Sequence, residues 1–135
     1  MTNASRPLPL PTRITQPFWE AAAQGQLLIQ RCRTCSRRQF YPRAMCVGCL
    51  SEDLRWEESS GQGSIYTYTI NHRAANEYMK ALLPYAVGII ELDEKVRMMG
   101  RIIASDLSAI RIGARVKVSF EQASPEIALP CFDLL

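Results

Sequence analysis

Two short cysteine motifs, Cys32-Arg33-Thr34-Cys35 and Cys46-Val47-Gly48-Cys49, are separated by ten residues. Each C-x2-C motif folds into a turn that brings two thiolates to one side, and two such turns complete a tetrahedron of sulfur around one Zn²⁺ ion. Four protein ligands leave no coordination position for a catalytic water. The spacing therefore predicts a closed, structural zinc site in a rubredoxin-like ribbon.

Iron is the main alternative metal, because thiolate sulfur binds both zinc and iron well. Rubredoxin turns typically place glycine after the second cysteine, whereas Ser36 and Leu50 stand at those positions in this chain. This difference favours zinc over iron. A ribbon without metal is the remaining alternative, although all four cysteine ligands are present.

Basic residues gather around the cysteine motifs. Residues 31 to 55 contain six arginines and two acidic residues, a net charge of +4, whereas the whole chain carries +3. One interpretation is that solvated arginines offset the −2 charge of a Zn(Cys)4 centre. The other is that some of them bind phosphate groups of a ligand or acidic groups of a partner. The arginines nearest the motifs are Arg31, Arg33, Arg37, Arg38 and Arg43.

Short strands are expected on both sides of the motifs: residues 27–29 lead in, residues 39–41 return between the motifs, and residues 54–57 lead out. A ribbon of this size has almost no apolar core. The bound metal must therefore supply much of its folding free energy.

The N-terminal side of the ribbon begins with an arm that contains three alternating prolines, Pro7, Pro9 and Pro11. Proline fixes an extended backbone and cannot pair inside a sheet, so residues 1–14 are expected to lie on a surface.

A short helix is expected from Gln16 to Gln24, with Thr15 as its N-cap and Gly25 just beyond its C-terminal end. Its apolar stripe would pack either on the protein's own core or on a partner. The stripe consists of Phe18, Trp19 and Ala22.

The sequence changes character after the turn at residues 60–63, where residues 64–70 alternate β-branched and aromatic side chains. Five short strands with almost no helix between them favour a small closed barrel of the OB type. The connection from residue 71 to 84 is long enough to hold a short helix or a functional segment. The other expected strands are residues 85–92, 96–103, 115–121 and 128–133, and the turn at residues 93–95 joins the first two of these in a hairpin.

We therefore expect a mainly β protein in three parts: a proline-rich arm and short helix (1–26), a zinc ribbon (27–57) and a five-stranded OB-fold barrel (58–135). With 135 residues, 47% hydrophobic and 21% charged, the chain has the size and composition of one globular domain.

Several kinds of site are missing from the sequence. His72 is the only histidine. A Ser-His-Asp arrangement would have to use it and leave no second histidine, and a two-histidine metal site cannot be built. A structural role is expected for His72, and Cys131 is expected to be a small core residue. The chain has no run of eighteen apolar residues, and its N-terminus has prolines in place of an apolar signal segment. We expect a cytoplasmic protein without membrane contact.

The order of several motifs resembles one known family, the acyl-CoA-associated zinc-ribbon plus OB-fold proteins (domain of unknown function 35, DUF35). The resemblance extends over nearly the whole chain from about Pro7. The motifs are Pro17-Phe18-Trp19, Gln30-Arg31-Cys32-x2-Cys35, Phe40-Tyr41-Pro42-Arg43-x2-Cys46-x2-Cys49, Gly61-x-Gly63-Ser64-Ile65-Tyr66-Thr67-Tyr68-Thr69, Pro84-Tyr85 and Leu129-Pro130-x-Phe132. Cys131 departs from the family, which usually has an aliphatic residue there.

The resemblance implies an accessory subunit with no activity of its own, bound to a thiolase or to a lipid-transfer-protein-like thiolase or aldolase. In such complexes the ribbon and barrel help to form the channel for an acyl-CoA, so a CoA thioester would be a ligand shared with the partner. Candidate residues facing CoA or the partner are Phe18, Trp19, Arg33, Arg43, Tyr66, Tyr68, His72, Arg73 and Tyr85.

The competing interpretation is a nucleic-acid-binding module, because zinc ribbons and OB barrels also serve that purpose and OB barrels stack bases on aromatic side chains. Tyr66 and Tyr68, two residues apart on one strand, are expected to share a face. Acidic and basic residues are nearly balanced from Gly63 onward, which gives no electrostatic track for a phosphate backbone. We therefore expect no nucleic-acid partner.

Overall fold

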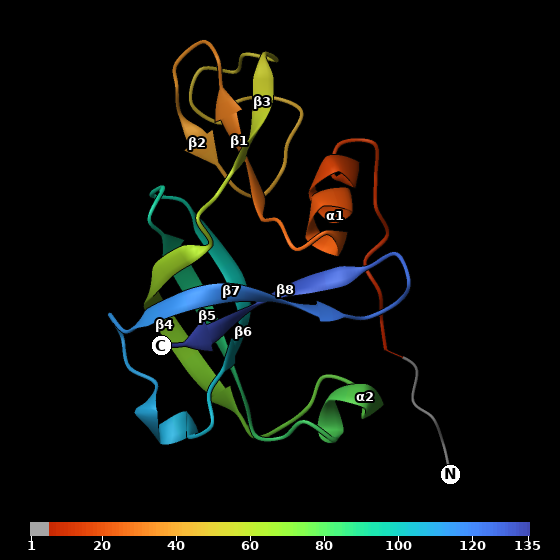
Figure 1. Ribbon diagram of the computed structural model, residues 1–135, viewed down its shortest axis with the longest axis vertical. Helices are drawn as coiled ribbons and strands as arrows, with labels where there is room; N and C mark the ends of the chain where they lie inside the picture. Colours follow the sequence, from red (N-terminus) through yellow and green to blue (C-terminus); the bar gives the residue numbers. More distant parts are fainter. Residues whose placement is uncertain (1–5) are drawn as a thin grey trace.

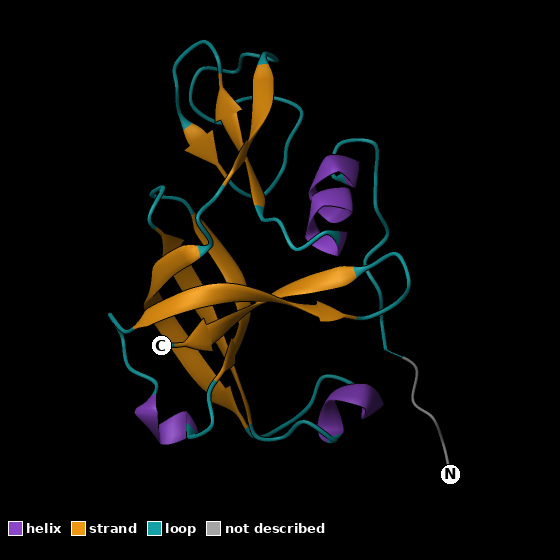
Figure 2. Ribbon diagram, viewed as in Figure 1, coloured by secondary structure: helices purple, strands orange, loops and turns teal. Residues whose placement is uncertain are grey.

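The computed structural model describes residues 6–135, so the first five residues of the expected arm lie outside the described part. Figure 1 shows a small three-stranded ribbon at one end of the molecule, helix α1 beside it, and a closed five-stranded barrel below. Strands dominate the structure, and the helices lie at its periphery (Figure 2). None of the helices in the described part is long and apolar enough to cross a lipid bilayer.

Helix α1 (Gln16–Ala23) starts where the sequence predicts and ends one residue earlier. Gly25 has a φ of 80°, the left-handed conformation expected just after a helix. The predicted N-cap hydrogen bond is absent, because Thr15 already has helical backbone angles and its Oγ1 accepts a hydrogen bond from the Thr12 amide at 2.8 Å.

The ribbon contains β1 (Leu28–Cys32), β2 (Arg38–Gln39) and β3 (Leu54–Glu58), in the antiparallel order β2-β1-β3. The predicted return strand at residues 39–41 is displaced, because β2 pairs only at Arg38 and Gln39. Phe40 and Tyr41 leave the sheet, and Phe40 packs against Phe18 of α1 with ring centroids 5.4 Å apart.

The barrel contains β4 (Gln62–Asn71), β5 (Tyr85–Leu92), β6 (Arg97–Ile103), β7 (Arg115–Gln122) and β8 (Ala128–Leu134). The strands close in the order β4-β5-β6-β8-β7, and the pairing of β6 with β8 is parallel. This confirms the predicted OB barrel. A short helix, α2 (Glu77–Lys80), lies in the long connection after β4, and a 3-10 turn, η1 (Leu107–Ala109), follows β6.

The barrel interior is filled by apolar side chains, and Phe132 on β8 is fully buried among them. A glycine on β6 makes room for its ring, since a Cβ at Gly100 would lie 2.8 Å from the Phe132 ring. The same cluster includes Phe18 of α1 and Leu27 and Ile29 at the start of the ribbon. The three parts of the chain therefore share one continuous core.

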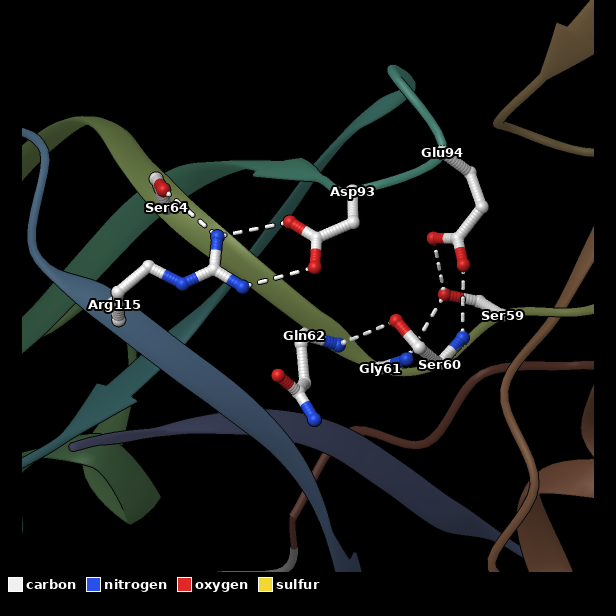
Figure 3. A network of polar contacts seen from close by, with 8 residues as sticks. All are labelled: Ser59, Ser60, Gly61, Gln62, Ser64, Asp93, Glu94 and Arg115. Carbon is white, nitrogen blue, oxygen red and sulfur yellow. Dashed lines mark hydrogen bonds and ion pairs between the residues drawn. The ribbon is translucent and has the colours of Figure 1, made fainter.

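A polar joint connects the ribbon to the barrel at residues 59 and 60, where β3 passes into β4 (Figure 3). The carboxylate of Glu94, in the β5–β6 turn, accepts hydrogen bonds from Ser59 Oγ at 2.7 Å and the Ser60 amide at 2.9 Å. We call these contacts the Ser59–Glu94 joint. Next to it, Arg115 of β7 makes a bidentate pair with Asp93, with N···O distances of 2.8 and 2.9 Å.

Candidate metal centre and cavity

The four cysteines of the two motifs meet at one end of the ribbon. Their Sγ atoms all lie within 4.8 Å of one another, with Cys32 and Cys49 3.6 Å apart and Cys35 and Cys46 3.5 Å apart. With a Zn–S distance near 2.3 Å, the edges of a zinc tetrahedron are about 3.8 Å long. The cluster therefore fits one tetrahedral ion, and the four cysteines form the metal site of a zinc ribbon.

Backbone amides point at the sulfur atoms, as the metal-binding thiolates require. The Thr34 and Cys35 amides donate to Cys32 Sγ at 3.3 and 3.4 Å, and the Gly48 amide donates to Cys46 Sγ at 3.3 Å. A hydrogen bond to the charged form favours that form. The Cys35 amide, with the Thr34 amide, lowers the pKa of Cys32 to about 6.

The surroundings of Cys46 and Cys49 shift the pKa values of these two thiols in opposite directions. The Cys49 and Gly48 amides lower the pKa of Cys46. The Ser51 amide acts in the same direction on Cys49, but burial and hydrogen bonds to the other three sulfurs outweigh it and raise the pKa of Cys49 to about 12. A divalent cation at the centre of the cluster is what allows all four to bind as thiolates.

The backbone at Ser36 and Leu50 does not discriminate between zinc and iron. Both residues have positive φ, 66° and 64°, so they adopt the left-handed conformation that glycine supplies in rubredoxin turns. The absence of glycine was the sequence argument against iron. That argument no longer favours zinc over iron, and the choice of zinc depends on the family matches described below.

A pair of buried glutamines supports the second cysteine motif, a feature that the sequence reasoning missed. Gln39 donates to Gln30 Oε1 at 2.8 Å, and its own Oε1 accepts from the Val47 amide at 2.9 Å. Gln30 also bonds both backbone groups of Arg43, at 2.8 and 2.9 Å. The only signal for this pair in the sequence is one polar residue on the inward face of each of two adjacent strands.

Three of the five arginines near the motifs pair with acids of the ribbon. Arg38 makes two hydrogen bonds to Glu57, at 2.9 and 3.1 Å, and Arg31 lies 3.6 Å from the same carboxylate. Arg33 lies 3.7 Å from Asp53, with both side chains largely exposed. Much of the local positive charge is therefore balanced within the chain.

Two of the residues predicted to face CoA or a partner are buried in the protein's own core. Phe18 and Tyr85 are only 4% and 5% exposed, so each offers little surface to another molecule, and their contact with CoA or a partner stays a prediction. Phe18 contacts Trp19 edge to face, with ring centroids 4.9 Å apart. Trp19 itself remains half-buried.

The prediction that Tyr66 and Tyr68 share a face is wrong, because β4 has a bulge between Ile65 and Thr67. One extra residue in a strand turns the following side chains to the opposite face. Tyr68 packs against the barrel core, whereas Tyr66 is exposed and stacks under the Arg97 guanidinium, 3.7 Å from its ring centroid.

Five of the candidates are exposed. Tyr66 lies on β4, Arg33 and Arg43 belong to the ribbon, and His72 and Arg73 follow the end of β4.

A largely apolar cavity of about 550 Å³ opens where the arm, α1, the ribbon, the α2 connection and the barrel meet. Its apolar lining includes Trp19, Phe40, Met98, Met99 and Leu129. No single segment of sequence carries a signal for it, because its wall is assembled from seven separate segments of the chain.

The polar residues of the cavity are also far apart in sequence. Arg6 of the arm forms a short ion pair with Glu121 of β7, at 2.6 Å, and Arg101 of β6 lies 3.6 Å from the same carboxylate. Cys131, buried as expected, lies beside this group on β8. Burial and the nearby Glu121 charge raise the pKa of Cys131 to about 11, so its thiol is neutral.

Comparisons with known proteins agree with this architecture. Residues 19–55 match the rubredoxin-like zinc ribbon domain of ChsH2, and residues 56–121 match the C-terminal OB-fold domain of ChsH2. Among solved structures, the chain resembles one described as "Ltp2-ChsH2(DUF35) aldolase", with a TM-score of 0.84 and 31% identity over 94% of this chain and 98% of that chain.

Two curated relatives are named as a subunit and as a scaffold protein. A probable enoyl-CoA hydratase alpha subunit of Thermomonospora curvata is 33% identical over 96% of this chain, which spans 40% of that protein's length. A DUF35 domain-containing scaffold protein of Methanocaldococcus jannaschii is 34% identical over 68% of this chain and 65% of its own length. The chain therefore covers less than two thirds of both relatives.

Proposed function

We infer what this chain does from the fact that it belongs to the DUF35 family, whose members join a zinc ribbon to an OB-fold barrel. We propose that it is a non-catalytic accessory subunit of a thiolase-superfamily enzyme, either a thiolase or a lipid-transfer-protein-like thiolase or aldolase. In that complex it helps to form the acyl-CoA channel and supports cleavage or formation of C–C bonds on CoA thioesters.

The observation that carries this proposal is the likeness to the DUF35 chain of an aldolase whose name joins two components, Ltp2 and ChsH2. That likeness extends over nearly all of both chains. The names of the curated relatives, an alpha subunit and a scaffold protein, also describe proteins that work with others.

The residues of the chain support a non-catalytic part in such an enzyme. His72, its one histidine, is exposed after the end of β4. The cysteine cluster already supplies four ligands, so a bound metal would have no position left for substrate or water. We therefore assign the nucleophile and the proton transfers to the partner.

We propose that exposed basic residues of this chain contact the phosphate groups of CoA, which guanidinium groups bind well. Arg43 and Arg73 are the best candidates, because neither side chain has an ion pair within the described residues. Zinc thiolates and CoA substrates both suit a reducing compartment, and we propose the cytoplasm.

The test is co-expression with a thiolase-like protein encoded next to this chain's gene. A tag on this chain should retain the thiolase-like protein through size-exclusion chromatography. The complex should cleave or form C–C bonds on acyl-CoA, whereas this chain alone should have no activity. If the two proteins do not form a complex, the proposal fails.

Charge reversal then identifies which of the two arginines contacts CoA. Either Arg43→Glu or Arg73→Glu should raise the KM for acyl-CoA about tenfold, as expected for the loss of one charge-assisted contact. Arg111→Glu, at an exposed turn of the barrel, is the control and should leave the KM unchanged. Salt-sensitive binding of a single-stranded oligonucleotide by the isolated chain would instead favour the nucleic-acid interpretation.

A further inference from the structure

The cavity described above has the size and lining of a small-molecule site. Its volume of about 550 Å³ lies within the usual range of ligand pockets, about 300–1,000 Å³. Such sites commonly form where separate structural units meet, and this one lies between the arm, α1, the ribbon, the α2 connection and the barrel.

Most of the wall is suited to an apolar group of variable shape. Met79, Met98 and Met99 line it together with Trp19 and Phe40. Methionine is flexible and polarisable, so a wall rich in methionine adapts to differently shaped apolar ligands. The wall therefore offers contact area rather than a fixed outline.

The cavity wall carries more positive than negative groups. Two guanidinium groups, of Arg6 and Arg101, share the single carboxylate of Glu121, at 2.6 and 3.6 Å. The ring of Tyr78 lies under Arg6, with its centroid 4.7 Å from the guanidinium carbon. With the Cys131 thiol neutral, the charged groups that line the cavity sum to +1.

One donor at this end of the cavity lacks an acceptor. The Nε of Arg101 is buried and has no hydrogen-bond partner among the described residues. A buried, unsatisfied donor on a charged group is costly, which makes an acceptor supplied by a ligand favourable. An anionic oxygen would satisfy both the unpaired donor and the excess positive charge.

We propose that this cavity binds a small molecule with an apolar body and one carboxylate, and that Arg101 and Arg6 hold the carboxylate. The apolar body lies along Trp19, Phe40 and the methionines. The carboxylate of a free acid fits these charges, whereas the thioester carbonyl of the same acid carries no negative charge. The proposal does not depend on the proposed accessory function.

The experiment is an NMR titration of the 135-residue chain labelled with ¹³C at its methionine methyl groups. Sodium octanoate should shift the signals of Met79, Met98 and Met99 in a saturable manner. The Met45 signal should stay in place, because Met45 lies in the ribbon outside the cavity lining. 1-Octanol has the same chain without the charge and should bind at least about tenfold more weakly.

Variants of the charged residues test how the carboxylate is held. Arg101→Met keeps the apolar stem and should weaken octanoate binding about tenfold while leaving octanol binding unchanged. Arg97→Met is the matched control on the same strand, because Arg97 lies outside the cavity and pairs with Glu91 at 3.6 Å. It should leave octanoate binding unchanged.

Glu121→Gln keeps the proposal testable if Arg101→Met does not fold. Removing the competing carboxylate should strengthen octanoate binding several-fold. Equal binding of octanoate and octanol, no shift of the three methionines, or no strengthening in Glu121→Gln would each overturn the proposal. Tighter binding of octanoyl-CoA than of octanoate, followed by the same three signals, would also overturn the proposal, since the cavity would then be a thioester site.

Discussion

The ribbon and the barrel bury different kinds of side chain. The interior of the ribbon, beyond Leu27 and Ile29, holds Cys32, Cys46 and the hydrogen-bonded pair Gln30 and Gln39. The barrel buries large apolar side chains such as Ile90 and Phe132. Metal coordination therefore determines the shape of the ribbon, whereas apolar packing determines that of the barrel. The two regions should respond differently to the same kind of disturbance.

Removal of the metal should have the largest effect, confined to the ribbon. Zinc contributes about 10 kcal/mol or more to the folding of small zinc domains. Cys46→Ser, or treatment with a strong chelator, should therefore unfold residues 28–58 and leave the barrel folded. The measurement is an amide NMR spectrum together with metal analysis.

The control for this experiment is Cys131→Ser, which removes the one cysteine outside the cluster. This variant should keep one zinc per chain. If loss of metal also collapses the barrel signals, the two regions unfold as one unit and the contrast between them is wrong.

Truncation of a buried apolar side chain in the barrel should have the next largest effect, and this effect should be confined to the barrel. Phe132 is fully buried, so Phe132→Ala should lower the free energy of unfolding by about 3–5 kcal/mol. Urea denaturation followed by circular dichroism measures this loss. The exposed Ile112 provides a comparison, since Ile112→Ala should change stability by less than about 0.5 kcal/mol. Phe132→Ala should still bind zinc, and loss of zinc would contradict the separation.

The Ser59–Glu94 joint tests how firmly the two regions are connected. Glu94→Gln weakens two hydrogen bonds from the ribbon side and should lower stability by about 1–2 kcal/mol. The relative orientation of ribbon and barrel, measured by residual dipolar couplings, should become less defined. Asp93→Asn is a matched control, because Asp93 pairs only within the barrel, with Arg115. An unchanged orientation in Glu94→Gln would mean that the shared apolar core alone holds the two regions.

The smallest predicted effect is a pH dependence in the ribbon. The hydrogen bond from Arg38, with the nearby arginine charges, lowers the pKa of Glu57 below its ordinary value of 4.5. A carboxyl with a lower pKa in the folded state contributes stability above its unfolded pKa and loses it as pH falls through the folded pKa. Between pH 7 and pH 3, the free energy of unfolding of the wild-type chain should therefore fall by up to about 1 kcal/mol more than that of Glu57→Gln, as measured by urea denaturation. Equal losses would contradict this assignment.

The elements with strong local signals could be predicted from the sequence. Strand β5 has the predicted bounds, 85–92, because a nearly continuous apolar run lies between Pro84 and the turn at 93–95. The metal site could be predicted for a similar reason. Its four ligands lie within eighteen residues, and each pair is fixed by one tight turn.

The features that were missed depend on contacts between distant residues. The bulge in β4 that separates Tyr66 from Tyr68 is set by pairing with β5, about twenty residues later. Phe18 is buried because Phe40 leaves β2 and meets it. The charged group at the cavity joins residues 6, 101 and 121. No short window of sequence contains these partners, so local patterns could not reveal them.

Strand β8 pairs with β6 on one side and with β7 on the other, and it carries Phe132 into the core. During translation the ribosome makes β8 after every other strand, so the barrel cannot close until residue 134 has been added. All four zinc ligands, by contrast, are present once residue 49 has been made. A nascent chain can therefore bind zinc while the barrel strands still expose Ile65 and Ile90, and this interval is when the protein is most open to aggregation and to chaperones.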